Sequence, residues 1–205
     1  MVSNNRAIQI FCVLAGLVMG FTQFGIQAAE DNKPLKVEYE RPGTDFAQYR
    51  ALLINDLDIS KTKIVPPPWK ADQPFNWEVS AANNSALQSA FHAAMRDNIS
   101  ANDGYPIVAE PGPGVMEISV RIVSFMPYAE RDEKVTTRGS GEMRIQAELR
   151  DAQSEELLAI YEGPQEVGQN YKPNSNFSRL ENLQGLFDFW GRRIRESMDE
   201  DHARN

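Results

Sequence analysis

The sequence predicts an α+β domain, a two-layer sandwich in which two amphipathic helices cover one face of a mainly antiparallel sheet. Residues 142–150 alternate polar and apolar side chains without a break, which is typical of a strand with one buried face. Residues 80–99 and 178–198 repeat apolar side chains every three or four positions, which is typical of a helix with one buried face. We expect about four to five strands, in the order strand, helix, four strands, helix.

The centre of this sheet is a hairpin predicted over residues 141–161. Its first strand places four apolar side chains on one face: Met143, Ile145, Ala147 and Leu149. Residues 151–154 (Asp-Ala-Gln-Ser) have turn chemistry, and residues 157–161 form a second apolar run that is long enough to pair back. The polar face carries Glu142, Arg144, Glu148 and Arg150, and we interpret it as a solvated ladder of charges.

The remaining elements follow in chain order. Residues 50–59, 105–109 and 115–126 are predicted strands, and the last of them is the longest. Residues 61–77, 127–140 and 163–176 are rich in charge, proline or glycine and are predicted loops. Ser178 and Glu181 have the spacing of a capping box, so we expect the last helix to begin there.

The chain divides into four parts. Residues 1–28 are interpreted as a secretory signal, because Arg6 precedes an apolar run, residues 7–21, that is shorter than the about 20 residues of a membrane span. We expect cleavage after Ala28 or Ala29, with no stable membrane span afterwards; the alternative is an uncleaved membrane anchor. Residues 29–49 form a leader, residues 50–200 a single α+β domain and residues 201–205 a charged tail.

Composition narrows the classes of partner. Removing residues 1–28 removes Arg6 and no acidic residue, so the formal charge of −8 becomes −9. This negative charge argues against nucleic acids and anionic membrane surfaces as partners. The chain has one cysteine, Cys12, inside the apolar run, and two histidines, His92 and His202, that are far apart in sequence. We therefore expect neither a metal site nor a cofactor.

One pair of aspartates is the only arrangement in the sequence that suggests catalysis. Asp56 and Asp58 are two residues apart in a predicted strand, so their side chains are expected on the same face. Such a pair could share a proton or hold a cation, which would suit an acid-dependent hydrolase. The other interpretation is a solvated strand end, and without any further catalytic set we expect a protein that is not an enzyme.

Two loops are the candidates for binding. Trp69, Phe75 and Trp77 lie close together in a proline-rich loop and could stack against a small molecule or glycan, or fold back as a lid over the sheet edge or the helix ends. The loop after the longest strand is a candidate contact for a protein partner, since binding residues often lie in exposed loops. Its charged residues are Arg131, Asp132, Glu133, Lys134 and Arg138.

Four stretches resemble one bacterial family. Residues 41–50 (RPGTDFAQYR), 104–108 (GYPIV), 148–158 (ELRDAQSEELL) and 187–193 (FDFWGRR) are similar to segments of the envelope proteins grouped as domain of unknown function 3313. The resemblance covers residues 37–199 and implies an exported bacterial protein, in a family with no established activity. Many members carry a lipid on a cysteine, but the residues before Cys12 do not form a lipidation signal. We therefore expect a soluble periplasmic protein.

The leading hypothesis is a non-enzymatic accessory protein that contacts an envelope partner. A binding module for a small molecule or glycan is the alternative, and a hydrolase is the remote one.

Overall fold

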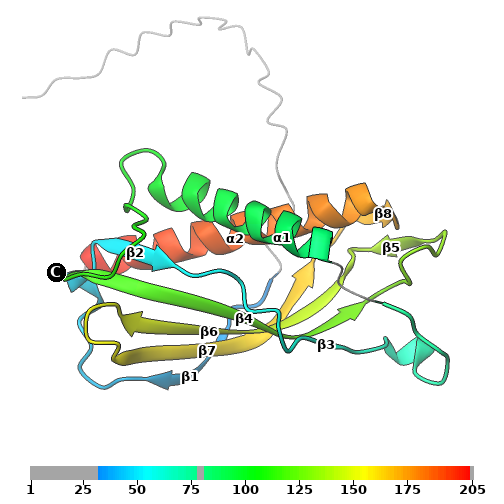
Figure 1. The fold of residues 1–205 in the computed structure, drawn as a ribbon, viewed down its shortest axis with the longest axis horizontal. Helices are drawn as coiled ribbons and strands as arrows, with labels where there is room; N and C mark the ends of the chain where they lie inside the picture. Colours follow the sequence, from blue (N-terminus) through cyan, green and yellow to red (C-terminus); the bar gives the residue numbers. More distant parts are fainter. Residues whose placement is uncertain (1–31, 78–80, 204–205) are drawn as a thin grey trace, which may run out of the picture.

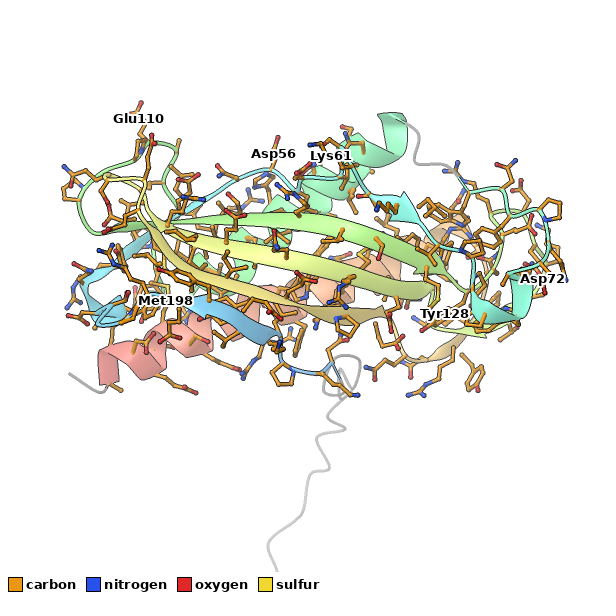
Figure 2. All side chains as sticks on the ribbon, turned by 90° about the horizontal axis from the view of Figure 1, so that it is seen from below. Asp56, Lys61, Asp72, Glu110, Tyr128 and Met198 are labelled. Atoms are coloured by element: carbon orange, nitrogen blue, oxygen red, sulfur yellow. The ribbon has the colours of Figure 1, made fainter. Side chains whose placement is uncertain are left out.

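The computed structural model describes residues 32–77 and 81–203, which form two layers. Figure 1 shows α1 (Ala81–Met95) and α2 (Asn176–Ala203) side by side over one face of a twisted sheet. The opposite face is not covered by a helix (Figure 2) and carries polar side chains, among them Arg121 and Arg144. The α+β prediction, with both helices on one side of the sheet, is confirmed.

The main sheet has six strands, somewhat more than expected. Its order is β1-β7-β6-β4-β2, and β3 also pairs with β4. The predicted hairpin is present as β6 (Gly141–Asp151) and β7 (Leu157–Val167), which pair antiparallel. β4 (Val115–Pro127) pairs antiparallel with the other side of β6 and points Met116, Ile118, Val120 and Ile122 into the core.

One edge of the sheet is parallel. β2 (Ala51–Ile54) and β3 (Lys63–Ile64) run along the same side of β4, and an isolated bridge joins Asp58 to Arg121 between them. The direction follows from the connection, because α1 carries the chain back so that β4 starts beside β2. The predicted strand at residues 105–109 contributes one bridge only, from Ile107 to Leu52.

The opposite edge contains two features that the sequence analysis placed in loops or leader. β1 (Lys36–Glu40) lies in the predicted leader and pairs antiparallel with β7. β7 continues to Val167, through the Gly163-Pro164 pair that was assigned to a loop. The pairing of β1 with β7 ends at Glu162, so Pro164 lies where β7 is itself an edge strand and its missing N–H breaks no ladder.

A small second sheet projects from the end of the main one. β5 (Thr136–Arg138) and β8 (Tyr171–Pro173) pair antiparallel, and we call them the ribbon. Both strands fall inside predicted loops, because a strand of three residues gives too short a pattern to recognise. Asn174 stabilises the adjoining turn by donating its Nδ2 to the carbonyls of Glu130 and Glu133, at 2.7 and 2.9 Å.

The core lies between the sheet and the helices. Phe91 of α1 meets Phe187 of α2 edge to face, with the ring centroids 5.5 Å apart. Trp190 is buried beside Phe187 and donates its indole N–H to Oε1 of Gln165 in β7, at 3.1 Å. Gly191 of α2 allows the backbone of α2 to approach α1 and the turn that follows it closely. A Cβ atom at this position would lie only 2.8 Å from Cβ of Asn98.

The last helix begins before the predicted capping box. α2 starts at Asn176, and the Ser175 hydroxyl accepts a hydrogen bond from the Ser178 N–H at 3.1 Å. Ser175 is therefore the N-cap, and Ser178 is a buried residue of the first turn. Within residues 32–77 and 81–203, none of the helices combines the length and apolarity that crossing a bilayer requires.

Candidate functional site

The candidate site is an open groove at the ribbon end of the molecule. It has a volume of about 660 Å³ and lies among the ribbon, the short helical turn Pro68–Lys70 and the ends of β4, β6 and β7. Figure 2 shows Tyr128 and Asp72 at this end, with Glu110 and Met198 at the other. The lining side chains include three aromatic rings and six charged groups: Trp69, Tyr128, Tyr171, Lys33, Lys70, Arg138, Glu133, Glu142 and Glu166.

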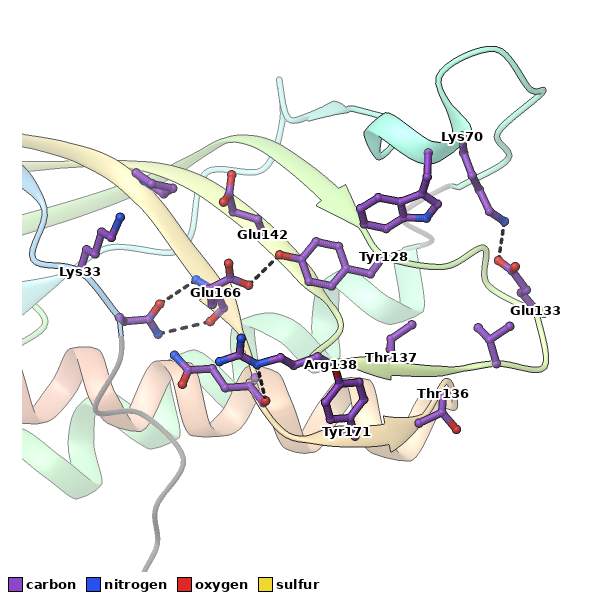
Figure 3. Close-up of a pocket in the computed structure, with 16 residues that line it drawn as sticks. Lys33, Lys70, Tyr128, Glu133, Thr136, Thr137, Arg138, Glu142, Glu166 and Tyr171 are labelled. Atoms are coloured by element: carbon purple, nitrogen blue, oxygen red, sulfur yellow. Dashed lines mark hydrogen bonds and ion pairs between the residues drawn. The ribbon is translucent and has the colours of Figure 1, made fainter.

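Two carboxylates and a phenol meet in the groove. Glu142 of β6 and Glu166 of β7 are directly opposite each other in the antiparallel register, on the face that points away from the helices. The Tyr128 hydroxyl donates to Oε2 of Glu166 at 2.7 Å (Figure 3). Burial, and next the Glu166 carboxylate, raise the pKa of Glu142 above its usual value. Burial and the same carboxylate raise the pKa of Tyr128.

Two of the three aromatic residues of the groove, Trp69 and Tyr171, are largely exposed. Trp69 is 60% exposed, and its ring centroid lies 5.8 Å from that of Tyr128, at an interplanar angle of 52°. Tyr171 on the ribbon is 76% exposed. Large exposed rings beside carboxylates are typical of surfaces that bind a ligand with both apolar and polar groups.

The predicted aromatic loop is divided by the structure. Trp69 lines the groove, whereas Trp77 packs edge to face on Phe125, with the centroids 5.0 Å apart, and lines a separate cavity under the helices. Phe75 is half-buried and lines neither space. The three side chains therefore do not form one stacking surface, and Trp77 behaves like the lid residue of the alternative interpretation.

The predicted charged loop supplies two residues to the groove. Glu133 accepts a hydrogen bond from Nζ of Lys70 at 2.5 Å, which lowers the pKa of Glu133. Arg138 lies on β5 and donates Nε to the carbonyl of Gln169 at 3.1 Å. Of the remaining three, Arg131 lines the cavity under the helices, whereas Asp132 and Lys134 are exposed to solvent.

The two aspartates of the catalytic hypothesis have different partners. Asp56 contacts Nε2 of His92 in α1 at 2.6 Å, and its side chain is 80% exposed. Asp58 accepts hydrogen bonds from Ser60 and from Nε of Arg121, and these lower its pKa to about 2. An aspartate with this pKa is ionised at neutral pH and cannot act as a general acid there.

Four residues that line the groove were not predicted as site residues from the sequence. Tyr128 and Tyr171 were assigned to loops, Glu142 to a solvated charge ladder, and Glu166 to the loop after Gly163. In the structure, Gln165 and Val167 are buried and Glu166 is half-buried, as in any strand with one buried face. The sequence does not show this alternation, because the buried Gln165 is polar.

Two further cavities lie between the layers. One, of about 330 Å³, is bounded by α2 and β4; the other, of about 300 Å³, lies under α1 and the start of α2. Both cavities are lined mainly by apolar side chains of the core. Among the described residues, no three histidine, cysteine, aspartate or glutamate side chains come together in a way that could hold a metal ion.

The fold and the groove define a two-layer α+β protein with an open groove at one end of its sheet. A family model described as protein of unknown function, DUF3313, matches residues 21–194. The chain therefore belongs to the DUF3313 family, as its sequence motifs indicated. No curated protein sequence matches the chain at a significant level.

Solved structures with a similar arrangement share little sequence with this chain. Protein XCC0632 from Xanthomonas campestris, of the DUF330 family, is 8% identical, with a TM-score of 0.45 over 84% of this chain and 97% of that one. The PelC dodecamer from Paraburkholderia phytofirmans is 9% identical, with a TM-score of 0.38 over 78% of this chain and 96% of that one. At such identities these likenesses carry no argument about function.

Proposed function

We propose that this protein is an exported component of the bacterial cell envelope that acts by binding a protein partner at its ribbon end, without catalysing a reaction. The apolar run and cleavage site within residues 1–28 support export. The absence of a coherent acid–base pair at Asp56 and Asp58 favours binding over hydrolysis.

One observation carries this proposal: large apolar side chains are exposed together at the ribbon end. Most of the large exposed apolar residues lie on the turn before α1, on the ribbon strands or beside them, and in the first turns of α2. They are Trp69, Val135, Tyr171, Phe177 and Leu180. We call these five residues the apolar rim. Clustered apolar exposure rimmed by charge is typical of a protein-binding surface.

Site-specific photo-crosslinking tests the proposal. A photoreactive phenylalanine analogue replaces Tyr171, and in a matched strain it replaces Tyr39, which is exposed on β1. In intact envelopes of the native host we expect one defined adduct from position 171 and none from position 39. Equal labelling at both positions, or no adduct at position 171, contradicts the proposal. Mass spectrometry of the same samples identifies the partner and shows whether the mature chain begins after Ala28 or Ala29.

A second function is favoured by the groove itself. Its volume and its aromatic and carboxylate lining would also suit a small molecule or glycan stacked on Trp69. Titration with cell-wall fragments should then quench the fluorescence of Trp69, and Trp69→Phe should remove the response while Trp77→Phe retains it. A panel of fragments that leaves the fluorescence unchanged would exclude this candidate.

A further inference from the structure

The groove holds a pair of carboxylates that form no ion pair with the described residues. Arg144 follows Glu142 by two residues on β6, but it donates Nε to Oε1 of Glu162 at 2.7 Å. Among the described residues, the Glu166 side chain accepts a hydrogen bond only from the Tyr128 hydroxyl, and Glu142 forms neither a hydrogen bond nor an ion pair. Neither carboxylate of this pair is therefore neutralised by an ion pair in the part of the chain that the structure describes.

None of the three cations that line the groove forms an ion pair with Glu142 or Glu166 among the described residues. Lys70 contacts two carboxylates, Glu130 at 3.3 Å and Glu133 at 2.5 Å. Arg138 donates Nε to a backbone carbonyl, and Lys33 forms no ion pair with the described residues. Burial and Glu166 outweigh the opposing effect of Arg144 and raise the pKa of Glu142, as expected for a carboxylate that lacks a counter-charge.

Aromatic rings stand beside these carboxylates. Tyr128 contacts Glu166 and lies against Trp69, and Tyr171 faces the same groove from the ribbon. Figure 3 shows Tyr128, Glu142 and Glu166 converging on one part of it. A cation that approaches this point meets both negative charge and the faces of electron-rich rings, which together favour lysine, arginine and other organic cations.

Resting on the proposed function, we infer that the groove receives a lysine or arginine side chain of the partner protein, which pairs with Glu142 and Glu166 and packs against Tyr128 and Trp69. A protein segment fits better than a free cation because three residues of the apolar rim, Trp69, Val135 and Tyr171, line the groove and favour apolar neighbours of the basic residue. A bare metal ion would find only two carboxylates here, with no third acidic or histidine ligand among the described residues.

Binding of short blocked peptides tests this inference on the full mature chain. The probes are an Ala-Lys-Leu-Ala peptide and the same peptide with Nε-acetyl-lysine, which keeps the length and removes the charge. The Trp69 indole resonance in NMR spectra reports occupancy. Because one charge-assisted pair contributes about tenfold or more in affinity, we expect the acetylated peptide to bind about tenfold more weakly.

Matched variants locate the charge. Combining Glu142→Gln with Glu166→Gln should weaken binding of the lysine peptide by about tenfold or more. Glu148→Gln is the control, since Glu148 lies on the same face of β6 but is paired with Arg150 at 3.0 Å. Binding should also weaken as the pH falls through the raised pKa of Glu142. Glu166 and Arg144 are the charges that act on this carboxyl, and Tyr128, Arg138 and Lys33 are the other titratable groups that line this part of the groove.

Each outcome has a defined meaning. Equal affinity for the two peptides, unchanged binding by the double variant, or no saturable response overturns the inference. Binding of glucosamine but not of the lysine peptide also overturns it and points to an amino sugar. The proposed function is judged separately, by the adduct at position 171. If the double variant still forms this adduct, the proposed partner binding stands and the inference of a basic side chain at Glu142 and Glu166 is wrong.

Discussion

Single residues connect the helix layer to the sheet, and Trp190 is the most informative of them. Its indole N–H donates to Gln165, whose Nε2 in turn donates to the backbone carbonyls of Lys33 and Pro164, each at 2.9 Å. Gln165 is a buried polar residue, so its hydrogen bonds must be satisfied within the protein. One indole therefore holds together α2, β7 and the segment that precedes β1.

Truncating this residue should be costly. Trp190→Ala removes a large buried ring and leaves Oε1 of Gln165 without its donor, so we expect the free energy of unfolding to fall by about 3–5 kcal/mol. Trp69→Ala, at a residue that is 60% exposed, is the control and should cost less than about 1 kcal/mol. Urea denaturation measures both. Similar costs for the two variants would show that Trp190 does not pack as described.

The Glu142 carboxylate should make stability depend on pH. Its folded-state pKa is raised, so the folded protein binds more protons than the unfolded chain between the usual and the raised pKa. Stability attributable to this group is therefore present at low pH and lost as the pH rises through that window. We expect Glu142→Gln to raise the melting temperature at about pH 7 and to leave it unchanged near about pH 4. A lower melting temperature at neutral pH would contradict the uncompensated carboxylate.

At the level of elements, two glycines of α2 make opposite predictions. A Cβ atom at Gly191 would lie 2.8 Å from Cβ of Asn98 and 3.1 Å from the carbonyl oxygen of Ala94, whereas one at Gly185 would meet nothing within 4 Å. Gly191→Ala should destabilise the protein by about 1–3 kcal/mol through overpacking between the helices. Gly185→Ala should stabilise it by up to about 1 kcal/mol, because alanine is the better helix former. Thermal unfolding of both variants checks the pair, and the same sign for both would argue against the helix contact.

The strands differ in how well the sequence predicts them, for physical reasons. β4 and β6 were predicted because one face is buried and the other is wet, which imposes alternation. β1 was missed because all five of its residues are exposed, so no apolar pattern marks it. β2 was predicted as a strand, but its parallel pairing depends on how α1 returns the chain.

The candidate site was predicted only in part because it depends on register. Trp69, Glu133 and Arg138 were selected singly, from loops that looked unrelated. Their meeting with Glu142 requires that β6 and β7 pair with Glu142 opposite Glu166, and the length of β7 was underestimated at Gly163. A single sequence contains the alternation of each strand but not the alignment of one against another.

At the scale of the whole molecule, residues near the start of the described chain bond to β7, a late strand of the sheet. Asn32 brackets Glu166 of β7: its Oδ1 accepts from the Glu166 N–H at 2.7 Å, and its Nδ2 donates to the Glu166 carbonyl at 3.3 Å. These residues are 134 positions apart. Contacts of such separation close large loops and form slowly compared with a hairpin.

Pulse-labelled hydrogen exchange during refolding tests this order. We expect the amides of residues 142–150, within the hairpin, to become protected in an earlier phase than those of residues 37–41, which bond to β7. Asn32→Ala should weaken protection at residues 37–41 and leave the hairpin unchanged. Simultaneous protection of both sets would show that the sheet forms in one step.

The bracket at Asn32 has a consequence for biosynthesis. A ribosome makes Asn32 early and Glu166 late, so the β1 edge and the groove beside it cannot be completed until most of the chain has been made. Until then β1 lacks the strand with which it pairs. The β1 edge of a nascent chain would therefore stay unpaired for most of its synthesis, which is the state that the export proposed above requires of a chain that passes through a translocation channel before it folds.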